Sequence, residues 1–354
     1  MDIELLLSIL GSPYVNDEKD IKLSNDEKSR LYEVAYRNKV GLFFLNKLKQ
    51  SNSLGSLEKE YCRDLERYQE TCKTAIRLSS ALMQFTQNFA LFKFMKPYPH
   101  TPSDVDVLFF LSNKEYLNTV DQLINYGYFK IAESPSQIVV YDLRAGYENM
   151  DKRSVGGKKG GKYYIDLYGD VSASHFVYIN QESLKNHRTK IKFEDGEIQT
   201  LNPLADLSVV LTHSIIPEQL FTLGDYYTAL NYIKEMKRSE LNDLVAIFKS
   251  NNITHAGIES LNLTNSFHNL THGFRIDKID YLIEEMGGEN TSIINLDAPY
   301  RYDTKTLFKV LLERMRNKRG IGSMGSQLFH TATNPQMFKW VLYNIVFRRS
   351  RDTY

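Results

Sequence analysis

Two aspartates separated by a single residue stand at the start of an apolar run. Asp104 and Asp106 belong to the segment Ser103-Asp104-Val105-Asp106-Val107-Leu108. In a β-strand, residues i and i+2 face the same side, so both carboxylates would point into one space. Two ionised carboxylates that close repel each other unless a cation lies between them. The pattern therefore predicts a divalent cation with oxygen ligands, Mg²⁺ or Mn²⁺ in preference to zinc.

A third carboxylate stands alone in a second β-rich run. Asp166 lies in the middle of Tyr163-Tyr164-Ile165-Asp166-Leu167-Tyr168. If this run pairs with the first, Asp166 joins Asp104 and Asp106 on one face of a sheet. Three carboxylates suit a two-metal site for phosphoryl or nucleotidyl transfer. Asp142 and Asp170 are the alternatives for the third position.

The elements that must position these carboxylates follow from hydrophobic periodicity and turn residues. A proline-punctuated turn, Lys96 to Pro102, connects the first strand to the second, and Gly127 ends a short helix. The predicted strands are 89–92, 105–111, 128–131, 137–143 and 162–168, and the short helix is 114–126. These elements form a small mixed sheet.

Helical periodicity dominates on both sides of this sheet. It runs from Leu5 to about Phe89, and it returns after Pro203. The helices expected after Pro203 are 204–215, 223–236, 240–248, 276–285, 304–317 and 336–347. We therefore predict an α+β fold with three parts: an N-terminal helical region (1–74), an α/β core (75–200) and a C-terminal helical domain (201–354).

The order of the central elements resembles the nucleotidyltransferase fold of the polymerase β type. The approach to the Asp-x-Asp strand also looks like that of uncharacterised archaeal and bacterial nucleotidyltransferase-like proteins; it consists of Lys93, Lys96, Pro97, Tyr98, Pro99 and Ser103 to Leu108. The resemblance covers about residues 75–169, and it is weaker around Asp206, His213 and Asp225. It implies that Asp104 and Asp106 bind metal, and that Asp166 binds the catalytic metal and takes the acceptor's proton.

One departure from that fold concerns the grip on the triphosphate. Most members carry a Gly-Ser or Gly-Gly pair shortly before the Asp-x-Asp, whereas this chain reads Phe-Met-Lys-Pro-Tyr at 94–98. Lys93, Lys96 and His100 can donate to anionic oxygens instead. These three residues and Ser103 are therefore our candidate phosphate ligands before the strand.

Two basic segments are candidates for contacts with phosphates or with an RNA backbone. The loop at 153–162 carries Lys158 and Lys159 among glycines, immediately before the Asp166 strand. A solvated hairpin loop is the alternative interpretation. Near the C-terminus, basic residues alternate with aromatic ones and could hold a nucleic acid or an acidic partner, whereas a solvated helix face is the interpretation that we favour. These basic residues are Arg314, Arg316, Lys318, Arg319, Arg348, Arg349 and Arg351.

Composition excludes several classes of protein. The chain has 354 residues, 42% hydrophobic and 25% charged, with a formal net charge of +1, as in ordinary globular proteins. No apolar run approaches the roughly 20 residues that cross a bilayer. No basic signal segment is evident at the N-terminus. Cys62 and Cys72 lie too far apart along one predicted helix to form a disulfide, so we expect reduced thiols and a cytoplasmic protein.

Together these features favour a metal-dependent nucleotidyltransferase. It would transfer a nucleoside monophosphate from an NTP to a hydroxyl of RNA, protein or a small molecule, and release pyrophosphate. One alternative is a non-catalytic nucleotide-binding or interaction module on the same fold. Another is an Asp-x-Asp glycosyltransferase, against which the helical residues before the motif count.

Overall fold

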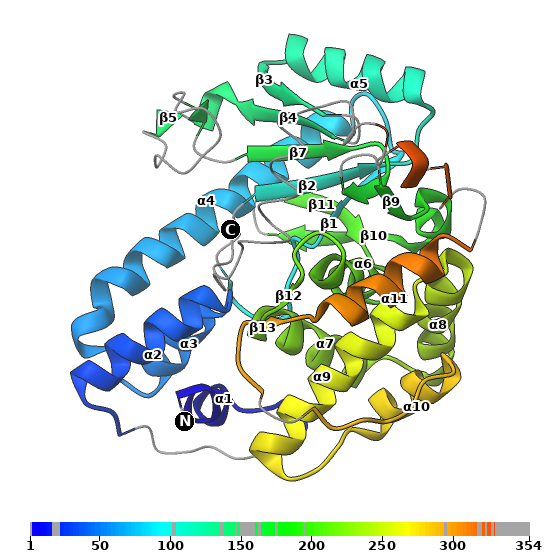
Figure 1. The fold of residues 1–354 in the computed structure, drawn as a ribbon. Helices are drawn as coiled ribbons and strands as arrows, with labels where there is room; N and C mark the ends of the chain where they lie inside the picture. The colour runs from blue at the N-terminus through cyan, green and yellow to red at the C-terminus, as the bar shows by residue number, and fades with distance from the viewer. Residues whose placement is uncertain are drawn as a thin grey trace.

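The computed structural model describes residues 2–15, 22–100, 104–134, 137–145, 147–148, 160–161, 164–173, 176–193, 196–293, 296–316 and short stretches between 321 and 329. A mixed sheet lies at one end of the molecule (Figure 1), with the helices that follow it packed below and the N-terminal helices to the side. The α+β class expected from the sequence is confirmed at this coarse level.

In the described residues before the sheet, the α-helices are α1 (Asp2–Leu10), α2 (Asn25–Arg37), α3 (Gly41–Gln50) and α4 (Glu58–Leu82). The α2 helix begins with a capping box, in which the Ser24 side chain and the Glu27 side chain satisfy each other's backbone N–H groups. The long α4 helix crosses residue 74 without a break and contacts both α3 and the sheet. The division of the chain at 74 and 200 remains a prediction.

The main sheet has seven strands in the order β10-β11-β1-β2-β7-β4-β3. Their bounds are β1 Phe89–Phe92, β2 Asp104–Phe109, β3 Tyr128–Glu133, β4 Gln137–Asp142, β7 Tyr164–Tyr168, β10 Arg188–Phe193 and β11 Gly196–Leu201. The central β2 strand is antiparallel to β1 and parallel to β7. Helix α5 (Asn113–Asn125) follows β2 and ends before Gly127, whose φ of 111° favours glycine. The central elements therefore lie where the periodicity placed them.

The β10–β11 hairpin was not predicted, although it extends the sheet beyond β1. Its signal is the alternation in Lys190-Ile191-Lys192-Phe193 followed by Asp195-Gly196, a typical turn pair. At Gly196 a Cβ atom would lie 2.6 Å from Cγ2 of Ile76 on α4. The close approach of the hairpin to α4 therefore requires glycine there.

Alternation along β2 divides the sheet into two faces. Val105, Val107 and Phe109 are buried with α4 and α5 side chains in one apolar core. Leu108 faces the opposite side, in the larger core formed with the N- and C-terminal helices. Because the side-chain period of a strand is two, Asp104 and Asp106 share the face of Leu108. The aspartates therefore face the helices on that side of the sheet and not α4 and α5.

Helices α6 (Pro203–Ile215), α7 (Leu223–Glu235), α8 (Arg238–Asn251), α9 (Thr254–His272), α10 (Asp277–Glu285) and α11 (Thr304–Arg314) follow the sheet. Five match predicted segments, whereas the buried α9 was missed because polar residues interrupt its apolar spacing. The helix expected at 336–347 lies outside the described residues. None of the helices that the structure describes has the length and apolar character to cross a membrane.

Short strands lie outside the main sheet in the described part of the chain. They are β5 Tyr147–Glu148, β6 Gly160–Gly161, β8 Val171–Ala173, β9 Phe176–Ile179, β12 Leu220–Phe221 and β13 Tyr300–Arg301. The β8–β9 pair matters for the site, because it carries Tyr178.

Candidate metal centre

The three aspartates that the sequence singled out meet on adjacent parallel strands. Asp106 of β2 is in register with Asp166 of β7, and Asp104 lies one side-chain position earlier on the same face. Carboxylate oxygens of Asp104, Asp106 and Asp166 all lie within 4.8 Å of one another. We call these residues the aspartate trio. The choice of Asp166 as the third carboxylate is the one that the geometry supports.

The rival carboxylates have other surroundings. Asp142 at the end of β4 is buried, and its oxygens bind Arg144 Nε at 2.7 Å and Arg77 Nε at 3.1 Å. Its charge is thus already neutralised by two guanidinium groups. Asp170 follows the end of β7 and is not part of the trio.

Burial and mutual repulsion disfavour ionisation in the trio. Burial raises the pKa of Asp106, and Asp104 adds to the rise while Lys93 opposes it. Burial also raises the pKa of Asp166, with further increases from Asp106 and Asp104. Three carboxylates this close need more positive charge than one lysine provides.

Among the residues that the structure describes, Lys93 forms an ion pair with the trio. Its Nζ lies 3.0 Å from Oδ2 of Asp106 and 5.1 Å from the centre of the Phe92 ring. The carboxylates of Asp106 and Asp104 raise the pKa of Lys93 against the effect of burial. A charged ammonium therefore borders the trio, as expected of a phosphate ligand at such a site.

Lys96 and His100 lie on the same turn, but neither joins the trio. The Lys96 side chain is half-buried in the field of Asp206 and Asp225, and burial lowers its pKa. His100 is buried against Tyr68, Phe94 and Tyr98, with ring centroids 5.8, 6.5 and 6.3 Å away. Burial and the neighbouring Lys96 lower the pKa of His100 to about 3, so its imidazole is neutral at physiological pH. The structure thus places these two candidates beside the site and not in it.

The remaining sequence candidates have separate outcomes. Ser103, Lys158 and Lys159 lie outside the described residues, as does most of the basic loop at 153–162. Arg314 is buried, and its guanidinium donates to the carbonyl oxygens of Val177 and Asn251, each at 3.0 Å. Arg314 therefore holds two segments together and does not belong to an exposed basic surface.

A chain of polar side chains beside the trio was missed by the sequence analysis. The Tyr178 hydroxyl lies 2.9 Å from Nδ1 of His213, whose Nε2 lies 3.5 Å from Glu218 Oε1. Lys39 Nζ approaches the same Glu218 oxygen at 4.0 Å. Burial would raise the pKa of Glu218, but Lys39 and His213 lower it overall. Burial and Lys93 lower the pKa of His213 to about 4. These four side chains come from three separate segments of the sequence, around residues 39, 178 and 213–218, so no spacing in the sequence reveals their contact.

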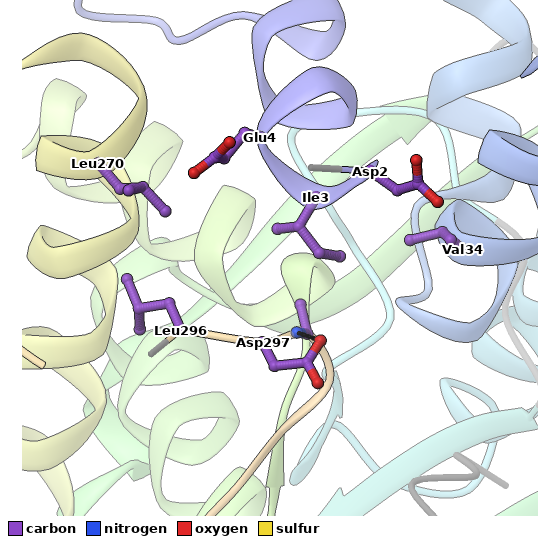
Figure 2. Close-up of a pocket in the computed structure, with 8 residues that line it drawn as sticks. Asp2, Ile3, Glu4, Val34, Leu270, Leu296 and Asp297 are labelled. Carbon is purple, nitrogen blue, oxygen red and sulfur yellow. Dashed lines mark hydrogen bonds between the residues drawn. The ribbon is translucent and has the colours of Figure 1, made fainter. Parts of the chain in front are cut away.

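A cavity in the described part of the molecule lies away from the trio. It has a volume of about 300 Å³ and is lined by residues of α1, α2 and α9 and by the segment that leads to β13 (Figure 2). The carboxylates of Asp2, Glu4 and Asp297 border it, beside apolar side chains such as Ile3 and Leu296. No member of the trio lines this cavity.

The donor set of the trio fits a hard divalent cation. All three side chains offer oxygen, the ligand type that Mg²⁺ and Mn²⁺ prefer. Oδ1 of Asp106 is buried and has no hydrogen-bond partner among the described residues, and a bound cation would compensate its desolvation. Asp104, Asp106 and Asp166 are therefore the residues that would hold the ion.

Comparisons with known proteins add little to this geometry. No protein-family model matches the chain, and no curated protein matches it. Among solved structures, it is similar to an antigenic nucleotidyltransferase-like protein from Paracoccidioides brasiliensis, with 9% identity and a TM-score of 0.30 over 53% of this chain and 91% of that one. At this TM-score the likeness carries no argument, so the function must be argued from the residues themselves.

Proposed function

We propose that this protein is a metal-dependent nucleotidyltransferase that moves a nucleoside monophosphate from an NTP to a hydroxyl acceptor. The observation that carries the proposal is the in-register pairing of Asp106 with Asp166 on parallel strands, with Asp104 on the same face. Two residues from one strand and one from its neighbour make a fixed constellation of oxygen ligands. Rigid strands hold such a constellation more precisely than loops do.

The reaction requires charge neutralisation and positioning more than covalent chemistry by the protein. The acceptor oxygen bonds to the α-phosphorus, the bond from that phosphorus to the bridging oxygen breaks, and pyrophosphate leaves. When bound, Mg²⁺ or Mn²⁺ would supply positive charge to the phosphate oxygens. Asp104, Asp106 and Asp166 hold the ions, and Asp166 takes the proton of the acceptor hydroxyl.

The cationic side chains next to the trio suit the phosphate groups of the NTP. Lys93 is closest, since its ammonium already lies at Asp106. Lys96 makes no ion pair or hydrogen bond to another described residue, so its ammonium is available to an anion. His100 is a neutral donor in this proposal, and Ser103 remains a candidate by its place in the sequence alone.

A non-catalytic nucleotide-binding module is the second candidate. The observation that favours it is the turn at 93–96, which has lysines where most members of the fold that the sequence resembles carry a glycine-containing pair. In this case Lys93 would serve as the counter-ion of the trio, and metal-dependent NTP binding would occur without release of pyrophosphate.

The test is transfer of label from each α-phosphate-labelled NTP with Mg²⁺ or Mn²⁺, with and without RNA and cell extract. We expect label transfer by the wild type and none by Asp106→Asn or Asp166→Asn. Asp121→Asn on α5 is the matched control, because it makes the same chemical change at an exposed position on the other side of the sheet. Full activity of Asp106→Asn would refute the proposal. NTP binding without transfer would favour the non-catalytic module, and release of UDP from a UDP-sugar would favour a glycosyltransferase.

A further inference from the structure

The backbone of Lys93 has an unusual conformation that is maintained from outside the sheet. Its φ is +57°, in the left-handed region that residues with a Cβ atom seldom adopt. The backbone N–H of Lys93 donates to Oδ1 of Asp206 at 2.5 Å. Asp206 lies in the first turn of α6 and is 2% exposed. A helix after the sheet thus fixes the residue that follows strand β1.

A second contact holds the same turn from α7. The Tyr232 hydroxyl donates to the carbonyl oxygen of Met95 at 2.5 Å and lies 3.5 Å from Oδ2 of Asp206. The two oxygens of Asp206 therefore face different neighbours, one the Lys93 backbone and the other Tyr232. The segment from Lys93 to Met95 is therefore hydrogen-bonded to α6 at its first residue and to α7 at its last residue.

Strained backbone is concentrated at the candidate site. Five non-glycine residues in the described part of the chain have positive φ, and Lys39, Lys93 and Gln219 are the three that are not asparagine. Lys93 contacts Asp106, Lys39 faces Glu218, and Gln219 adjoins Glu218. Conformations of this kind are energetically unfavourable and persist where the surroundings enforce them. At Lys93 the enforcing group is the Asp206 carboxylate.

We propose that Asp206 is a positioning residue that holds Lys93 in the left-handed conformation and so places its ammonium at the aspartate trio. In this left-handed conformation Lys93 places its Nζ 3.0 Å from Oδ2 of Asp106. An extended Lys93 would continue the alternation of β1 and direct its side chain to the opposite face from Phe92. The role in phosphate binding that Lys93 would then serve rests on the proposed function, whereas its placement does not.

The first test is structural and needs no activity. Crystal structures of the wild type and of Asp206→Ala are compared at Lys93. We expect Lys93 of the variant to leave the left-handed region and its Nζ to move away from Asp106. Asp206→Asn keeps an oxygen acceptor for the Lys93 N–H and should keep both features. An Asp206→Ala structure with Lys93 unchanged would overturn the proposal.

The second test is a double-mutant cycle on kcat/KM for label transfer. We expect Lys93→Met to lower it by about 100-fold and Asp206→Ala by about 10-fold to 100-fold, with Asp206→Asn within about 3-fold of the wild type. If Asp206 acts through Lys93, Asp206→Ala has no further effect in the Lys93→Met background. Additive losses would overturn the proposal.

Asn251→Ala is the matched control for lost stability. Asn251 is also fully buried and accepts a backbone N–H, that of Asn180 at 2.8 Å, and it has no hydrogen bond to the segment from Lys93 to Met95. We expect it to lower the melting temperature as Asp206→Ala does while leaving Lys93 and kcat/KM unchanged. If the wild type transfers no label, the proposed function fails, and the comparison of crystal structures still decides the role of Asp206.

Discussion

Asp106 and Asp166 face each other directly across the parallel β2–β7 pair, although 59 residues lie between them in the chain. Their side chains share one face with Asp104, and their oxygens approach within 4.8 Å. A repulsive cluster is thus built into the centre of a sheet. Strain of this kind is typical of functional sites, where stability is given up for activity.

Divalent metal should stabilise the folded protein. A ligand that binds only the native state at 100 times its Kd adds about 2.7 kcal/mol to the free energy of unfolding. We therefore expect Mg²⁺ or Mn²⁺ to raise the melting temperature of the wild type in a thermal-shift assay. Asp104→Asn should remove most of this shift, and Asp121→Asn should retain it. An equal shift in both variants would contradict the assignment of the trio.

Removing one charge from the trio should stabilise the metal-free protein. Burial and its two neighbours raise the pKa of Asp166. A carboxyl with a raised folded-state pKa stabilises the fold while protonated, and this stability is lost as pH rises above its ordinary value of about 4. The substitution Asp166→Asn should therefore raise the free energy of unfolding by about 1–3 kcal/mol, measured in urea at pH 8 with EDTA present. The same variant should lose activity. A less stable Asp166→Asn would argue against repulsion.

Removing the charge of Asp142 should destabilise the protein, in contrast to the substitution at Asp166. Its side chain is buried between Arg77 and Arg144, so Asp142→Asn leaves guanidinium groups without their partner. We expect a loss of about 1–3 kcal/mol in the free energy of unfolding. The metal-induced thermal shift should stay at the wild-type value, because Asp142 is not in the trio. Loss of that shift in a folded Asp142→Asn would reopen the choice of the third ligand.

Acid should destabilise the protein through His213. Burial and Lys93 lower its pKa from 6.5 to about 4. Protonation of His213 therefore favours the unfolded chain. The contribution of neutral His213 to the free energy of unfolding is present above pH 6.5 and is lost as pH falls towards 4. The loss amounts to up to about 3 kcal/mol.

The variant His213→Gln isolates this effect. Its free energy of unfolding, measured in urea at intervals from pH 7 to pH 4 with EDTA present, should fall less steeply than that of the wild type. His187→Gln, near the start of β10, is the control and should follow the wild-type curve. Parallel curves for His213→Gln and the wild type would show that His213 does not carry the acid sensitivity.

Local patterns were sufficient for the central strands and for the aspartates. The apolar run after Asp104 predicted β2, and the lone acid in Tyr164–Tyr168 predicted that β7 carries the third carboxylate. Both predictions depend on the two-residue period of a strand, which is a local property of the backbone. The β10–β11 hairpin was missed although its alternation and turn pair signal it, and α9 was missed because polar residues interrupt its apolar spacing.

The sequence by itself determined which side chains could bind a metal and which face of a strand they share. Only the tertiary structure decided that β7 pairs with β2, which places Asp166 beside Asp106. Asp142 instead forms ion pairs with Arg77 and Arg144. Only the tertiary structure, too, brought Asp206 to the backbone of Lys93. The physical reason is that periodicity fixes the direction of a side chain relative to its own element, whereas its neighbours depend on how distant elements pack together.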